Sequence, residues 1–268
     1  MFAWLLFPWV YNIYIGFFQY VLTRPDITKF IGVAHYAALL TNPDFLHAFY
    51  ETFLLTAILV VVELLFGLGQ ALLLSQDFRG VTVLRVLVGL PILLIPAGTS
   101  LIWKNLFFPD NGLVNYVTLS LGLGTIDWTA NYFYSSILII AADVWQWTPF
   151  FTIILLAALL SLPKEPYEAA KVDGLSTWTT FRKITIPMLM PVISIVSILR
   201  ILDLIKLMDP IYILTKGGQG TETLSYFIWR VAFKSLDMGI GGAISNLYWI
   251  SVWVLANVLL RVFRVALE

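Results

Sequence analysis

Long runs of apolar residues, separated by short polar joints, dominate the pattern along this chain. Most runs extend over 20 residues or more, and a membrane-spanning helix needs about 20 mostly apolar residues. A strand of a membrane barrel would instead alternate apolar and polar positions over about ten residues. The sequence therefore predicts an all-α polytopic membrane protein, a single transmembrane domain over residues 1–268 with about six spans. The six runs cover Phe2–Leu22, Phe45–Leu74, Leu84–Phe107, Tyr132–Leu162, Met188–Leu207 and Ile240–Val265.

The third run contains two prolines, Pro91 and Pro96. Proline has no backbone N–H, so a helix that contains it loses a hydrogen bond and bends. In a membrane the freed carbonyl groups must find partners inside the protein. We therefore expect this span to kink, and we expect other helices to supply the missing donors.

Composition agrees with lipid as the main solvent. Of the 268 residues, 60% are hydrophobic and 12% are charged, whereas soluble domains carry about 25% charged residues. The net charge of +0 offers no basic excess for nucleic acid. The chain has no cysteine and only two histidines, so disulfides, thiol catalysis and thiolate or histidine-rich metal sites are not expected. No catalytic triad or Walker motif is present either, so the chain is not expected to be an enzyme.

One polar segment, residues 163–187, interrupts the apolar chain. Pro166 suits the first turn of a short helix, and Gly174 suits the left-handed residue that ends one. Ser176 can cap a second short helix, and Pro187 opens the next membrane span. The segment therefore predicts a helix–turn–helix outside the bilayer. Ala169 and Ala170 would give its first helix a flat flank that another surface can approach closely.

This segment resembles the EAA signature of binding-protein-dependent ABC importer permeases. The resemblance rests on Glu168-Ala169-Ala170, Asp173-Gly174, Phe181, Ile184 and Pro187 at the family's spacing. Leu175 and Ile186 stand where the family usually has alanine and leucine, and both keep the apolar character. In the family this loop lies in the cytoplasm and binds an ATPase subunit. The resemblance thus implies ATPase coupling by Glu168, Ala169, Ala170, Asp173, Gly174 and Phe181.

Two further stretches resemble sugar permeases of the maltose type. Residues 143–150 are similar to the stretch before the signature, and residues 200–203 and 209–220 to the stretches after it. Lys216 and Gln219 depart from the family's usual glycine and proline, so that outer loop is expected to differ in detail from the family's. The resemblance therefore extends over nearly the whole chain and favours a sugar, oligosaccharide or polyol as cargo.

The resemblance also implies partners. Two related permease subunits would form the pore in a prokaryotic inner membrane, two ATPase subunits would bind the cytoplasmic loops, and an extracytoplasmic solute-binding protein would deliver the cargo. The partner ATPase would bind ATP and magnesium, so no cofactor is expected in this chain. Transport would follow alternating access, driven by ATP binding and hydrolysis in the partner.

Ionisable residues inside the apolar runs are the candidates for the transport path. They cost about 2.5–3.5 kcal/mol each on insertion scales, so they usually face a cavity or a partner. On the fourth run, Asp143, Gln146, Trp147 and Phe150 share one helical face. A carboxylate, an amide and aromatic rings suit the hydroxyls and the apolar face of a sugar. The candidate path residues are Asp143, Gln146, Trp147, Phe150, Arg200, Asp203 and Leu207.

Structural interpretations of the same residues stay open. Asp143 can instead pair with Arg200 in a helix–helix contact, and such a pair can also border a cavity. Arg200 and Asp203, one turn apart, favour a local ion pair. For Glu63, in the second run, a structural hydrogen bond is favoured over contact with cargo.

The glycine-rich stretch Lys216-Gly217-Gly218-Gln219-Gly220 is not a nucleotide-binding loop. It lacks the Gly-Lys-Ser/Thr ending and does not lie between a strand and a helix. We interpret it as a contact for the solute-binding protein, with a flexible joint as the alternative.

Other functions remain to be weighed. A gradient-driven secondary transporter could use Asp143 or Glu63 as a proton site, and an importer of this class could carry an amino acid or oligopeptide instead of a sugar. A membrane-embedded enzyme has little support because no paired catalytic groups stand out.

Overall fold

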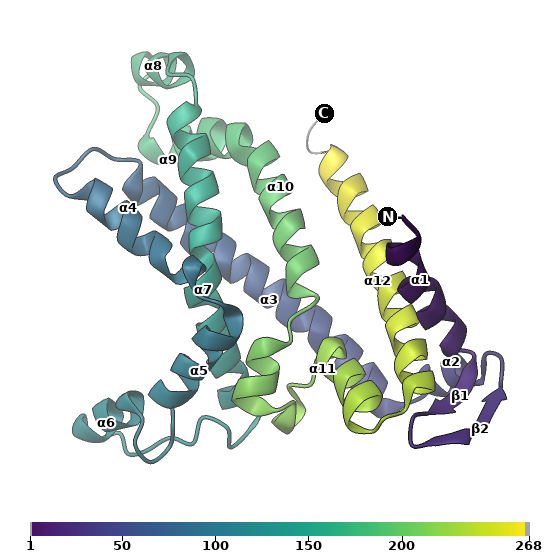
Figure 1. Cartoon of the computed structure of the whole chain (residues 1–268). Coiled ribbons are helices and arrows are strands. Elements are labelled where there is room, and N and C mark those ends of the chain that lie inside the picture. Colours follow the sequence, from purple (N-terminus) through teal and green to yellow (C-terminus); the bar gives the residue numbers. More distant parts are fainter. Residues whose placement is uncertain (1, 266–268) are drawn as a thin grey trace.

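The computed structural model describes residues 2–265, and helices dominate it (Figure 1). Among the described residues, four helices are long and apolar enough to cross a membrane. They are α3 (Pro43–Leu74), α7 (Tyr132–Ser161), α10 (Ile186–Leu204) and α12 (Met238–Val265). The predicted all-α multi-pass architecture is thus confirmed. Met1 and residues 266–268 of the predicted single domain lie outside the described part of the chain.

The third predicted span is broken rather than merely kinked. Its pieces are α4 (Val81–Gly89), the 3-10 turn η1 (Leu90–Leu93) and α5 (Pro96–Leu106). The two halves meet at 98°. Pro91 is the second residue of the 3-10 turn and Pro96 the first residue of α5, where a missing N–H removes no helical hydrogen bond. The described part of the chain therefore has four spans, or five if this bent pair is one span, instead of the expected six.

The first predicted span is also shorter than expected. Helix α1 (Phe2–Ile15) covers 14 residues and ends before Gly16, where a Cβ would lie 2.6 Å from the Tyr36 hydroxyl. The chain then forms an antiparallel hairpin of β1 (Phe18–Val21) and β2 (Arg24–Phe30). An apolar run does not by itself distinguish helix from strand, so the hairpin was not predicted. The hairpin is fixed to the start of α12 by the bond from Leu22 N to Leu236 O, 2.9 Å.

Short helices fill the joints. They are α2 (Ala34–Leu39), α6 (Leu113–Ser120), α8 (Glu165–Val172), α9 (Thr177–Thr180) and α11 (Leu224–Trp229). Turns with π or 3-10 geometry are η2 (Phe181–Thr185), η3 (Ile211–Thr215), η4 (Gly218–Gly220) and η5 (Arg230–Lys234).

The local predictions for residues 163–187 are largely confirmed. Pro166 lies in the first turn of α8, Gly174 follows that helix with φ of 71°, and Ser176 Oγ accepts the Thr179 N–H at 3.2 Å. The second short helix, however, is not separate. Helix α9 continues through η2 into α10 as one helix from Thr177 to Leu204. Pro187 lies in the first turn of α10, directly after the π turn η2, and the helix continues through it.

The main core lies where α3 and α7 pack against each other over much of their length. Gly67 on α3 brings the two backbones close, because a Cβ there would meet Phe151 Cβ at 2.4 Å. Leu59 and Leu155 are fully buried in the same core. A second core joins α2, α3, α11 and α12, and α1 lies along α12 (Figure 1). Helices α3, α7 and α10 therefore form the body that positions the site.

We expect Gly67→Ala to destabilise the protein, because the added methyl group overpacks the α3–α7 contact at a cost of about 1–3 kcal/mol. Thermal unfolding in detergent measures the loss. Gly69→Ala on the same helix is the matched control, since nothing lies within 4 Å of its Cβ position. Equal melting temperatures for the two variants would contradict the close contact.

Candidate functional site

Arg200 is the centre of the most polar region inside the helical body. Its side chain, on α10, is 2% exposed and reaches Glu63 on α3, which is fully buried. Nε donates to Glu63 Oε2 at 2.7 Å, and Nη2 donates to Glu63 Oε1 at 2.8 Å. Two parallel charge-assisted bonds of this kind are among the strongest polar contacts in proteins. They fix α10 to α3.

The same guanidinium serves two more carboxylates. Nη2 also donates to Asp143 on α7, and Nη1 donates to Asp203, one turn further along α10, at 2.8 Å. The Trp147 ring lies against the guanidinium, with 4.5 Å between the arginine Cζ and the ring centroid. We call Glu63, Asp143, Arg200 and Asp203 the ion cluster. It joins α3, α7 and α10, so these helices are held at one register.

Several structural interpretations from the sequence are confirmed here. Asp143 pairs with Arg200, Arg200 pairs locally with Asp203, and Glu63 makes a structural contact. What the sequence did not reveal is that Glu63 and Arg200 are partners, because 137 positions separate them. The available signal was electrostatic: an acid inside one apolar run and an arginine inside another must find partners within the bundle.

A cavity of about 170 Å³ borders the ion cluster. Five of the seven candidate path residues line it, namely Asp143, Trp147, Arg200, Asp203 and Leu207. The other lining residues are Pro96, Lys206, Met208, Asp209 and Pro210. The cavity therefore lies between α7, the end of α10 and the start of α5. We call it the charged cavity.

Gln146 and Phe150 do not line the charged cavity. Gln146 Nε2 donates to the carbonyl of Leu94 at 2.8 Å, in the break between η1 and α5. This supplies the donor that the proline-rich break was expected to need. Gln146 points there because three residues along a helix rotate a side chain roughly 60° away from Asp143. Phe150 packs against the main core and meets the Trp147 ring edge to face at 6.4 Å.

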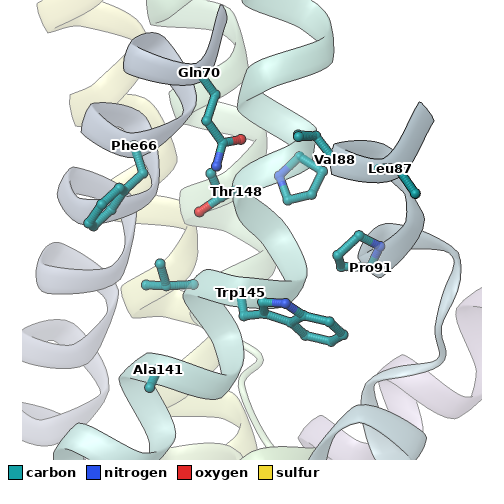
Figure 2. Close-up of a pocket in the computed structure, with 10 residues that line it drawn as sticks. Phe66, Gln70, Leu87, Val88, Pro91, Ala141, Trp145 and Thr148 are labelled. Carbon is teal, nitrogen blue, oxygen red and sulfur yellow. The ribbon is translucent and has the colours of Figure 1, made fainter. Parts of the chain in front are cut away.

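A larger cavity of about 470 Å³ lies on the opposite face of α7, toward α3 and α4 (Figure 2). Phe66, Gln70, Trp145 and Thr148 are among its lining residues, and none of its lining residues is charged. None of the candidate path residues lies in it either. The charged cavity therefore carries the polar chemistry of the body, although it is the smaller of the two.

At one end of the molecule, α8 projects beyond the helical body (Figure 1). Glu168, Ala169 and Asp173 are exposed, and Phe181 is partly buried. Ala170 is only 3% exposed because the chain turns back on it, with Leu175 N donating to Ala170 O at 2.9 Å. The expected flat flank of two alanines is thus wrong for Ala170, which packs against its own chain and leaves Ala169 alone at the surface.

The stretch 216–220 forms a tight loop rather than an open joint. Lys216, Gly217, Gln219 and Gly220 all have positive φ, between 54° and 82°. His47 Nε2 lies 2.8 Å from the Gly220 carbonyl, and the Thr215 and Thr221 hydroxyls are 2.7 Å apart. Positive φ at non-glycine residues costs free energy and persists only when the surroundings enforce it. This loop lies beyond the C-terminal end of α10, remote from α8 (Figure 1).

The fold and the site together define a multi-pass membrane protein whose helices link an internal charged cavity to a projecting loop. Residues 1–267 match the family described as the binding-protein-dependent transport system inner membrane component. The chain belongs to this family, whose members are the membrane-spanning permease subunits of ABC transporters.

Curated relatives include permeases named for sugars. The trehalose/maltose transport system permease protein MalF of Thermococcus litoralis is 35% identical over 236 residues, which cover 88% of this chain and 80% of that protein. The trehalose transport system permease protein SugA of Mycobacterium tuberculosis is 31% identical over 97% of this chain and 83% of its own length.

A solved structure has the same fold. It is a chain of a bacterial ABC transporter involved in the import of the acidic polysaccharide alginate, with a TM-score of 0.82 at 21% identity over 98% of this chain and 96% of that chain.

We expect Arg200→Met to be strongly destabilising. It leaves Glu63 and Asp143 buried without a counter-charge, and breaking a buried ion pair from one side costs about 3–5 kcal/mol. The yield of monodisperse protein in detergent, and its melting temperature, measure the loss. Lys206→Met is the control, because Lys206 is 66% exposed and its 3.5 Å contact with Asp203 is a surface ion pair. If both variants melt alike, the ion cluster does not hold the helices together.

Proposed function

We propose that this chain is one transmembrane subunit of an ATP-driven importer that carries a sugar, oligosaccharide or polyol across a prokaryotic inner membrane. The observation that carries the proposal is the arrangement of α7 and α10. Both helices line the charged cavity, and both run to the loop that carries α8. One pair of helices thus connects a polar cavity to a projecting surface.

The chemistry of the charged cavity supports a polyhydroxylated cargo. Carboxylates of Asp143 and Asp203 can accept hydrogen bonds from hydroxyl groups, and Trp147 can cover the apolar face of a sugar ring. The names of the relatives from Thermococcus and Mycobacterium, which refer to trehalose and maltose, point to the same class of cargo. Sugar is therefore favoured over an amino acid or an oligopeptide.

The exposed side of α8 suits a partner ATPase. Glu168 lies in the first turn of α8, and Val172 and Trp178 are 87% and 68% exposed. Exposed apolar side chains beside a carboxylate are typical of a surface that another protein covers. The partner would bind ATP and magnesium and hydrolyse the nucleotide, and the α8 loop would then lie in the cytoplasm.

Two further partners complete the proposed transporter, and one of them would bind at the end of the molecule opposite α8. The tight loop of residues 216–220 would contact an extracytoplasmic solute-binding protein, and a second, related permease would complete the pore. A related structure is titled as an alginate ABC transporter in complex with a periplasmic protein that holds an alginate pentasaccharide. Its chain shares 21% identity and a TM-score of 0.79 with this one.

Transport would proceed by alternating access, and the stiff helices α7 and α10 would transmit movement from α8 to the charged cavity. From Trp147 to the end of α7 at Ser161 is about 20 Å of helix at 1.5 Å per residue. The ion cluster holds α7 and α10 together, so a displacement of α8 would reach the charged cavity as a movement of both helices. ATP binding would open the cavity outward, and hydrolysis would reset it inward.

A gradient-driven secondary transporter is less well supported. Its two candidate proton sites, Asp143 and Glu63, both accept hydrogen bonds from Arg200 and are buried. Arg200 already holds both carboxylates, so uptake of a proton there would break contacts that join α3, α7 and α10.

We expect Glu168→Lys to uncouple ATP hydrolysis from transport, because it reverses the charge at the proposed ATPase contact. Transport and ATP hydrolysis are measured together on the reconstituted complex, and the expected result is a transport loss of roughly tenfold or more. Glu165→Lys, also exposed in the first turn of α8, is the matched control and should have the smaller effect. Full transport by Glu168→Lys would remove the coupling role.

We expect Trp147→Ala to reduce transport more than it reduces the amount of assembled complex, because the ring covers Arg200 and lines the charged cavity. Trp145→Ala is the control, since Trp145 lies on the opposite face of α7 in the other cavity (Figure 2). Transport per assembled complex should fall severalfold for Trp147→Ala only. Equal losses of transport and of assembled complex would indicate that Trp147 serves packing alone.

A further inference from the structure

The charged cavity has an excess of negative charge. Five ionisable side chains line it, and three of them are carboxylates: Asp143, Asp203 and Asp209. The two cations are Arg200 and Lys206. Glu63 adds a fourth carboxylate directly behind the wall, on Arg200. Four carboxylates and two cations thus lie in or directly behind this cavity. The low dielectric constant of the cavity walls strengthens the negative electrostatic potential that the extra carboxylates produce.

Arg200 has little left to offer an acidic cargo. A guanidinium carries five N–H groups, and four of those on Arg200 already donate to Glu63, Asp143 and Asp203. Recognition of a carboxylate or sulfonate by arginine uses two adjacent parallel donors. The edge formed by Nε and Nη2 is occupied by Glu63, and one face of the guanidinium is covered by Trp147. The buried cation is therefore neutralised before any cargo arrives.

The rim of the cavity is negative as well. Lys206, 66% exposed, is engaged with Asp203 at 3.5 Å. Asp209 is exposed at the end of the same segment and has no ion-pair partner within residues 2–265. A cargo that enters from the outer end of α10 therefore meets an unpaired carboxylate at the rim.

The geometry points to a charge selectivity that the fold alone does not set: the charged cavity admits neutral or cationic saccharides and rejects those with a carboxylate, sulfonate or phosphate group. Asp209 is the specificity-determining residue at the rim. The inference rests on the proposed function, because it concerns what the same cavity transports. The structure with the same fold belongs to an importer of an acidic polysaccharide at 21% identity, so the fold by itself does not fix the charge of the cargo.

The test uses the assembled complex in liposomes with its solute-binding protein and ATPase. Trehalose and maltose are assayed first. The transported sugar is then compared with two derivatives, one in which a primary hydroxyl is replaced by an amino group and one in which it is oxidised to a carboxylate. We expect the amino derivative to be transported at a rate close to that of the parent sugar, and the carboxylate to be slower by about tenfold or more.

The variant Asp209→Asn separates the permease from the binding protein. Each derivative is delivered by the same binding protein to wild-type and variant complexes, so the preference of the binding protein cancels in the ratio. Binding of each derivative to the complex in nanodiscs without binding protein is the second readout. Asp209→Asn should raise transport or binding of the carboxylate severalfold relative to transport or binding of the parent sugar. Asp110→Asn, an exposed aspartate outside this cavity, should change neither.

Each outcome decides something different. If the carboxylate moves as fast as the parent sugar, or if Asp209→Asn affects both sugars equally, the charge selectivity is wrong while the importer stands. If no saccharide is transported in an ATP-dependent manner, the proposed function fails and the inference fails with it.

Discussion

The structure depends on one buried arginine and the three carboxylates that surround it. An isolated charge in a membrane interior is expensive, and Arg200, Glu63 and Asp143 are each almost completely buried. None of them reaches its partners unless α3, α7 and α10 are packed at one register. A shift of one helix by a single turn would leave a charge unpaired. The ion cluster therefore selects one arrangement of the three helices, whereas apolar packing alone would define that arrangement less well.

The break in the third span follows the same rule on a smaller scale. Backbone carbonyls freed by a bend must be satisfied within the protein when no water is at hand. The Leu94 carbonyl is satisfied by Gln146, which projects from α7 beside Asp143. Pro96, at the start of the second half of the span, lines the charged cavity. The same bend therefore contains a backbone group satisfied by α7 and a residue that lines the cavity. Of the polar residues on α7, Asp143 lines the cavity and Gln146 supports the bend.

The two ends of the molecule are connected by long, continuous helices. The continuous helix formed by α9, η2 and α10 runs from Thr177, next to α8, to Leu204, next to the charged cavity. Tyr167 on α8 donates a hydrogen bond to Thr185 at 3.1 Å, which ties the projecting helix to this continuous segment. At the other end, His47 ties the loop of residues 216–220 to α3. The helices of the ion cluster are therefore tied to both proposed partner surfaces. The helix that contains α10 is tied to α8, and α3 is tied to the loop of residues 216–220.

The sequence by itself determined the elements whose signals are local. The apolar runs of α3, α7, α10 and α12, the cap at Ser176 and the left-handed Gly174 were all predictable, because each depends on residues within a few positions of one another. The family was also predictable from the sequence, because residues 163–187 resemble a known signature. Only the tertiary structure decided that Phe18–Val21 is a strand, that Ala170 is covered, that Gln146 serves the break at Leu94, and that Glu63 is the partner of Arg200. The contacts of Gln146 and Glu63 join segments far apart in the chain, and hydrophobic periodicity carries no information about which segments meet.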